Sequence, residues 1–195
     1  MNYLGHAFLS YNNADILAGN MIADHVKGRA AFEKFPPGIQ RGIVLHRKID
    51  ARADIHPATL RAKLLFREDY GRYSGAIMDT LYDHFLANDP AIFANEQALL
   101  DFSLKVYAQL DENQIYFPDK FAAYFSSMKQ HNWLYGYRTT KGMERALNGL
   151  ARRANYMPPI NKAYDIFITA YYQLNQCYYE FIDDIISFVK NESTY

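Results

Sequence analysis

The stretch of residues 35–57 reads FPPGIQRGIVLHRKIDARADIHP and predicts one long helix between two proline-containing turns. Pro37 suits the first turn of a helix, because its missing N–H would have no partner there. His56 precedes a proline, and this position disfavours helical backbone. We therefore expect a helix from about Gly38 to about Ala51.

Helical spacing of apolar residues recurs on both sides of this stretch, and no alternating β-branched run predicts a strand. We expect further helices over about 15–27, 57–69, 75–88, 95–111, 118–130, 140–154 and 159–190, the last long enough to contain a bend. The predicted fold class is all-α, a single-domain bundle of about seven to nine helices over residues 1–195.

The composition is that of an ordinary globular protein, with 50% hydrophobic and 22% charged residues. Lys and Arg together number 21 and balance 21 Asp and Glu, which predicts no whole-molecule attraction to nucleic acid or to an anionic membrane. No segment approaches the ~18 apolar residues of a membrane span, and the N-terminal segment lacks the basic start of a signal peptide. We expect a cytoplasmic protein whose single cysteine, Cys177, is a buried structural thiol.

Polar residues recur at helical spacing within the first 84 residues. His46 and Asp50 lie four apart, as do Asp79 and Asp83, so each pair should share one helix face. The other members of this set also lie in apolar surroundings: His6, Asn20, Asp24 and His84. Three further histidines are expected to be structural or peripheral: His25, His56 and His131.

Carboxylates held beside apolar side chains are costly unless they are paired or bind a cation. Several that converge would repel one another, and a divalent ion would remove that repulsion. Carboxylates with some imidazole suit Mg²⁺, Mn²⁺ or Fe²⁺. The alternative remains that Asp50 pairs with Arg47 or Arg52, that Asp79 and Asp83 are solvated, and that single histidines are structural.

Basic residues cluster in the same part of the chain. They are Lys27, Arg29, Lys34, Arg41, Arg47, Lys48 and Arg52. Such a cluster is either a solvated face or a binding surface for an anion, such as a phosphate ester or an acidic protein.

Four motifs resemble the acyl carrier protein phosphodiesterase family. They are MNYLGHAFLS at 1–10, LAGNMIADHVKG at 17–28, the stretch at 35–57 and MDTLYDHFLA at 78–87. A weaker similarity lies in RALNGLARR at 145–153. The resemblance implies a fold distantly related to the HD-domain metal phosphohydrolases. It also implies Mn²⁺-dependent hydrolysis of the phosphodiester between 4'-phosphopantetheine and a serine of holo acyl carrier protein.

The matching polar positions imply roles for individual residues. We expect the metal ligands among Asp24, His46, Asp50, Asp79 and Asp83, and the catalytic acid and base among His6, Asp50 and His84, with Asp24 as another possible base. Substrate contacts are expected from Arg41, Arg47, Lys48 and Arg52. Two alternatives stay open, a phosphohydrolase of nucleotides or other small phosphate esters and a non-catalytic module that binds an acidic protein.

Overall fold

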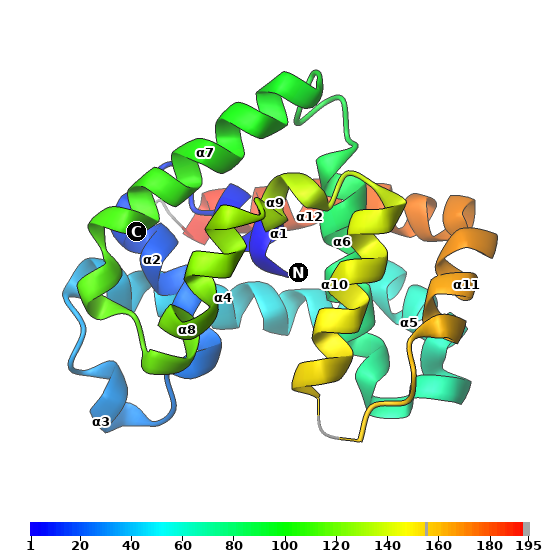
Figure 1. The fold of residues 1–195 in the computed structure, drawn as a ribbon, viewed down its shortest axis with the longest axis horizontal. Helices are drawn as coiled ribbons and strands as arrows, with labels where there is room; N and C mark the ends of the chain where they lie inside the picture. The colour runs from blue at the N-terminus through cyan, green and yellow to red at the C-terminus, as the bar shows by residue number, and fades with distance from the viewer. Residues whose placement is uncertain (155, 193–195) are drawn as a thin grey trace.

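The computed structural model describes residues 1–154 and 156–192, and this part of the chain is helical without a strand (Figure 1). The all-α prediction is therefore confirmed. The first half contains α1 (Tyr3–Phe8), α2 (Ala14–Ile22), α3 (Arg29–Phe32), α4 (Pro37–Ile55), α5 (Pro57–Tyr70) and α6 (Ser74–Ala87). The second half contains α7 (Glu96–Glu112), α8 (Asp119–Gln130), α9 (Trp133–Gly136), α10 (Thr140–Arg153), α11 (Asn161–Thr169) and α12 (Tyr171–Glu192).

Three of these described helices, α1, α3 and α9, have only four to six residues. The sequence pattern did not predict them, because so short a helix gives little periodicity. The other described helices correspond to the expected ones. The pattern over 159–190 divides at Ala170 into α11 and α12, which is the expected bend.

The segment after α2 departs from the prediction of a helix up to Lys27. The α-helix ends at Ile22 and continues as a 3₁₀ turn, η1 (Ala23–His25), because Val26 takes an extended conformation. Gly28 follows with a φ of 78°, a value that favours glycine. This early end places Asp24 on a turn that faces α4.

The crossing of α2 and α4 depends on two glycines. A Cβ on Gly19 would lie 2.0 Å from the carbonyl oxygen of Ile39, and one on Gly42 would lie 2.2 Å from the carbonyl oxygen of Ile16. Both neighbours are backbone atoms, which cannot move aside cheaply. The two helix backbones therefore approach closely, and the end of α2 comes beside the middle of α4.

The core surrounds α6, which contacts α1, α5 and α10. Its side chains Leu81 and Tyr82 are fully buried, and the ring of Tyr82 stacks on Phe181 of α12 with centroids 4.8 Å apart. Cys177, on the same helix as Phe181, is a buried free thiol, as expected. Two further 3₁₀ turns, η2 (Gly71–Tyr73) and η3 (Gln114–Tyr116), connect helices at the periphery.

Within residues 1–154 and 156–192, none of the helices combines the length and the apolar character that a bilayer crossing requires.

Candidate metal centre

Two imidazoles and a carboxylate converge where α1, α2 and α4 meet. His6 comes from α1, and His46 and Asp50 lie one turn apart on α4. One donor atom from each of the three residues lies within 4.8 Å of the other two. The i,i+4 spacing of His46 and Asp50 thus does place both side chains at one point.

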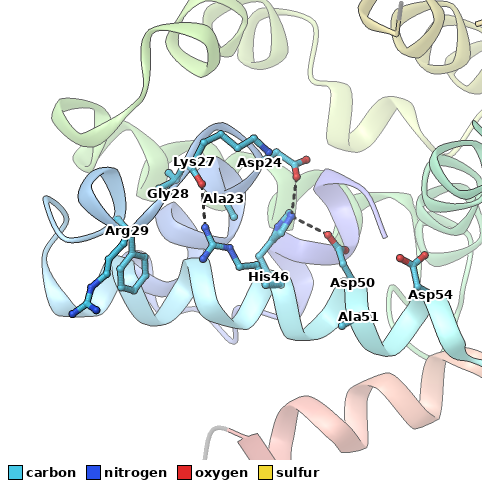
Figure 2. Close-up of a pocket in the computed structure, with 12 residues that line it drawn as sticks. Ala23, Asp24, Lys27, Gly28, Arg29, His46, Asp50, Ala51 and Asp54 are labelled. Carbon is cyan, nitrogen blue, oxygen red and sulfur yellow. Dashed lines mark hydrogen bonds and ion pairs between the residues drawn. The ribbon is translucent and has the colours of Figure 1, made fainter.

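His46 is oriented by the backbone of α2. Its Nδ1 lies 2.8 Å from the carbonyl oxygen of Asn20, and because a carbonyl only accepts, Nδ1 donates the proton. Nε2 then faces Oδ2 of Asp50 at 3.1 Å and Oδ1 of Asp24 at 3.4 Å (Figure 2). A histidine anchored by one nitrogen to a carbonyl presents the other nitrogen in the way that metal-binding histidines do.

His6 lies against His46, with the two rings stacked at a centroid distance of 3.9 Å. Its Nε2 is 3.2 Å from Oδ1 of Asp50, so the carboxylate contacts both imidazoles, one with each oxygen. The side-chain amide of Asn20 donates to the carbonyl oxygen of His6 at 2.9 Å and fixes α1 against α2. Asn20 therefore positions both histidines, one through its side chain and one through its backbone.

The donor atoms fit a divalent cation. Both ring nitrogens of His6 and Nε2 of His46 are buried and lack a well-directed hydrogen bond within the described part of the chain, despite their proximity to Asp50. Buried polar atoms are ordinarily paired, so two such Nε2 atoms that face one carboxylate indicate a site for an ion. Two imidazoles with one or two carboxylates suit Mn²⁺, Fe²⁺ or Zn²⁺.

The charges within the cluster are strongly coupled. Burial disfavours the charged ring of His46, but Asp24 and Asp50 outweigh it and raise the pKa of His46 to about 9. Burial also opposes ionisation of Asp50, yet the adjacent imidazoles of His46 and His6 hold the pKa of its carboxyl well below the usual range. Burial and the neighbouring His46 lower the pKa of His6 to about 4. The proton on Nε2 of His46 therefore faces both Asp24 and Asp50, and a bound cation would replace it there.

Asp79 lies at the edge of this cluster. Its Oδ1 is 2.9 Å from the amino group of Met1, which is also 3.8 Å from Oδ1 of Asp50. Burial raises the pKa of Asp79, and the adjacent ammonium opposes that shift. The carboxylates of Asp24, Asp50 and Asp79 line one cavity of about 280 Å³ together with both imidazoles.

Asp83 binds backbone N–H groups and does not line the cavity of the cluster. Its carboxylate is fully buried and accepts N–H bonds from Asn2, Leu4 and Gly5 at 2.8–3.2 Å. Burial raises the pKa of Asp83 to about 7 despite these donors. Asp83 thus caps the start of α1, the helix that carries His6, and the structure does not bring its oxygens into the group of three donor atoms.

The structure does not bring His84 to the cluster either. Its Nδ1 is 2.7 Å from the carbonyl oxygen of Tyr137, and its Nε2 is 2.9 Å from the hydroxyl of Tyr171. Phe85 and Phe167 meet the ring edge-on, and burial lowers the pKa of His84. With both nitrogens engaged inside the aromatic core, His84 has no position from which to protonate a substrate at the cluster.

The predicted substrate-binding residues separate onto different faces of α4. Arg47 donates to the carbonyl oxygen of Val26 at 3.0 Å and lines a groove of about 740 Å³ beside Asp24, His46 and Asp50. The other three do not line this groove: Lys48 pairs with Glu192, Arg52 lies over the ring of Phe188, and Arg41 is exposed.

Several residues of the site were not predicted from the sequence. Tyr124 of α8 contacts the hydroxyl of Tyr3 at 2.8 Å and Nε2 of His25 at 2.6 Å, and all three line the cavity of the cluster. Arg153, at the end of α10, lines it too. These residues come from segments far apart in the chain, so spacing alone carried no signal. His56, which was expected to be structural, caps α5 and contacts Asp184.

Comparisons with known proteins find relatives that cover most of this chain. A chain of Enterobacter sp. (strain 638) named acyl carrier protein phosphodiesterase is 28% identical over 192 residues, covering 98% of this chain and 99% of the relative. The one from Photorhabdus laumondii is 26% identical over 195 residues, covering 100% and 98%. The one from Yersinia pestis is 32% identical over 153 residues, covering 78% and 79%.

No solved structure matches this chain, so the expected distant relation to HD-domain hydrolases stays a prediction. The family profile described as acyl carrier protein phosphodiesterase matches residues 1–185 of the 195. By this match, the chain belongs to the acyl carrier protein phosphodiesterase family.

Proposed function

We propose that this chain hydrolyses the phosphodiester that joins 4'-phosphopantetheine to a serine of holo acyl carrier protein, with a divalent cation as cofactor. Membership of the family supports the substrate. The observation that carries the chemistry is the convergence of His6, His46 and Asp50, with donor atoms within 4.8 Å of one another. The products are apo acyl carrier protein and free 4'-phosphopantetheine, because the water oxygen bonds to phosphorus, the bond from phosphorus to the serine oxygen breaks, and that oxygen takes up a proton from the water.

We assign the cation, Mn²⁺ in the first instance, to His6, His46 and Asp50, with Asp24 as a further carboxylate at the open side of the cluster. Bound there, it would neutralise charge at phosphorus and lower the pKa of a water molecule. His6 is thereby a ligand in this proposal, and its low pKa keeps the ring neutral and able to donate a lone pair.

The chain's own residues supply the rest. Asp24 has a side chain 76% exposed, and its pKa is lowered by the hydrogen bond from His46. An ionised, accessible carboxylate at the open side of the cluster is suited to accept a hydrogen bond from a water molecule and orient it. Arg47 is the one predicted substrate-binding residue that lines the adjacent groove, and it is suited to hold a phosphate oxygen or an acidic side chain of the carrier protein.

The same groove is the proposed docking surface for the carrier protein. Lys27 and Arg29 line it from one side and Arg47 from α4, with Phe32 between them. None of the three cations neutralises a carboxylate of the groove: Arg29 pairs with Glu33 outside it, and neither Lys27 nor Arg47 forms an ion pair in the described ranges. Complementary charge of this kind favours encounter with an acidic protein.

The direct experiment incubates holo acyl carrier protein with the purified chain and Mn²⁺ and records the intact mass of the carrier. Loss of the 4'-phosphopantetheinyl mass is expected, together with its suppression by a chelator and by Asp50→Asn. An unchanged carrier mass, with turnover of a nucleotide in a parallel panel, would contradict the proposed substrate. An unchanged mass with no metal bound would contradict the hydrolase account as a whole.

A further inference from the structure

A second and larger cavity adjoins the metal centre on the side away from the groove. It measures about 540 Å³ and lies among the first residues of the chain, α8, α9 and α10, and Figure 1 shows the N-terminus between α8 and α10. It shares Asn2, Tyr3, Tyr124 and Arg153 with the cavity of the cluster. The groove shares Asp24, His46 and Asp50 with that same cavity and no residue with the larger one.

The three spaces are therefore arranged in series, with the cluster between the surface groove and the larger cavity. A phosphodiester has two substituents on phosphorus, and they leave the phosphorus in different directions. With the phosphorus at the cluster, one substituent is directed toward the groove and the other toward the larger cavity. The groove lies open at the surface and carries Lys27, Arg29 and Arg47 beside Asp24, Asp50 and Asp54, which suits contact with a folded protein, so the cavity is left for the smaller substituent.

One face of α10 keeps this cavity open. Gly142, Ala146 and Gly149 lie along it at spacings of four and three. Gly142 allows the backbone of Gly136 to approach α10 closely, whereas Ala146 and Gly149 leave space in the cavity. A Cβ on Gly149 would meet only Nη1 of Arg153 at 3.6 Å, and one on Gly136 of α9 would meet nothing within 4 Å. The small residues at 136 and 149 thus leave space where most side chains would project into the cavity. Ala146 and Gly149 of this face belong to the motif RALNGLARR at 145–153, which the metal centre does not explain.

The walls opposite α10 combine aromatic surface with hydrogen-bonding groups. The rings of Tyr124 and Trp133 stack with an interplanar angle of 7°. The amide of Asn2 donates to the hydroxyl of Tyr137 at 3.1 Å, and Ser127 and His131 also line the cavity. Arg145 and Arg152 of α10 line it as well. Its volume lies within the ~300–1,000 Å³ of small-molecule sites, and this mixture of surfaces is typical of them.

We propose that this cavity binds the pantetheine arm of the substrate, and this inference rests on the proposed function. The arm is an uncharged chain with a gem-dimethyl group, a hydroxyl, two amides and a terminal thiol. The aromatic rings and the small residues of α10 receive its apolar groups, and the hydroxyl and amide side chains pair with its amides. Arg153, which lines both cavities and forms no ion pair within residues 1–154 and 156–192, lies at the junction where the phosphate meets the arm.

The test compares two phosphate monoesters that differ only in the arm. The affinities of 4'-phosphopantetheine and of methyl phosphate for the Mn²⁺-loaded chain are measured by calorimetry. We expect the first to bind at least about tenfold more tightly. Gly149→Trp fills the cavity and should bring the two affinities to near equality. Asn148→Trp is the matched control, since Asn148 is exposed on the same helix and lines none of the three cavities.

Ala146→Phe gives a second obstruction at another position, and circular dichroism checks that each variant keeps its helices. Equal affinities of the two esters for the unaltered chain would overturn the inference, whether or not the holo carrier protein is cleaved. The inference would also be overturned if Gly149→Trp and Ala146→Phe both still bound 4'-phosphopantetheine more tightly than methyl phosphate. Failure of the proposed function would be seen in a different experiment, the hydrolysis assay, as an unchanged mass of the carrier protein.

Discussion

His46 and His84 are two buried histidines with similar sequence settings and different surroundings. Each lies on a helix near a carboxylate, and each places Nδ1 2.7–2.8 Å from a backbone carbonyl oxygen. At Nε2 they differ, because His46 faces Asp24 and Asp50, whereas His84 faces the hydroxyl of Tyr171. The carboxylates raise the pKa of His46 to about 9, and burial lowers that of His84.

The comparison shows that anchoring and burial alone do not identify a functional histidine. Both rings are fixed in one orientation by a carbonyl, as metal-binding histidines are. The partner of the second nitrogen makes the difference: a pair of acids beside a cavity in one case and a tyrosine inside the aromatic core in the other.

The largest effect is expected from Asp50→Asn. The substitution keeps the shape of the side chain but removes the negative charge that contacts both His6 and His46. Loss of a cation is worth several kcal/mol of transition-state stabilisation, so kcat/KM for holo carrier protein should fall by about 10³-fold or more. His84→Gln serves as the control and should keep kcat/KM within a few fold. Equal losses in the two variants would remove the distinction between the sites.

The pH dependence of Mn²⁺ affinity should follow His46. Without a cation its folded pKa is about 9, above its ordinary value near 6.5, so a proton must leave when the ion binds. His6, with a pKa of about 4, is already neutral. Affinity should rise by about tenfold per pH unit from pH 7 and level off near pH 9.

Calorimetry in buffers of different ionisation enthalpy measures this proton directly. About one proton per bound ion should be released at pH 7.5. In the metal-free protein, the raised pKa of His46 adds to the free energy of unfolding. This contribution is fully present below pH 6.5 and is lost as the pH rises through 9. Binding of Mn²⁺ without proton release would show that His46 is not a ligand.

His84→Leu should affect stability and leave catalysis intact. The leucine leaves the carbonyl of Tyr137 and the hydroxyl of Tyr171 without their buried partner, which costs about 1–3 kcal/mol of unfolding free energy. Urea unfolding monitored by circular dichroism measures the change. A loss of activity larger than the loss of folded protein would return His84 to the catalytic residues.

The smallest effect is expected in the docking surface. Arg47→Glu reverses a charge that lines the groove and should raise KM for holo carrier protein by about three- to tenfold at low salt. Lys48→Glu is the matched control on the next residue, because Lys48 contacts Glu192 of α12 outside the groove. The difference should diminish at high salt. Equal KM values for the two variants would place the docking surface elsewhere.

The sequence predicted those parts of the site that depend on local geometry. The i,i+4 spacing of His46 and Asp50 followed from the helix at 35–57, and the structure does place them on one face. The same spacing for Asp79 and Asp83 did not distinguish their environments. Asp83 is buried because α1 packs across α6 and directs its first N–H groups at the carboxylate, and this contact spans 78 to 81 residues of sequence.

The remaining features depend on packing between distant segments. The α-helix α2 ends at Ile22, although the apolar sequence pattern continues through Val26. This early end directs Asp24 toward His46, and the pattern did not predict it. The cavity beside α10 needs α8, α9 and the first residues of the chain to be placed around it. Helical periodicity contains no information on which elements will face one another across such a space.

The most direct test of the central claim is a crystal structure of the chain grown with Mn²⁺, recorded with anomalous scattering from manganese. We predict an anomalous peak coordinated by Nε2 of His46, a ring nitrogen of His6 and a carboxylate oxygen of Asp50. A preparation that cleaves holo carrier protein but shows its manganese away from these three residues, or shows none, would contradict the account.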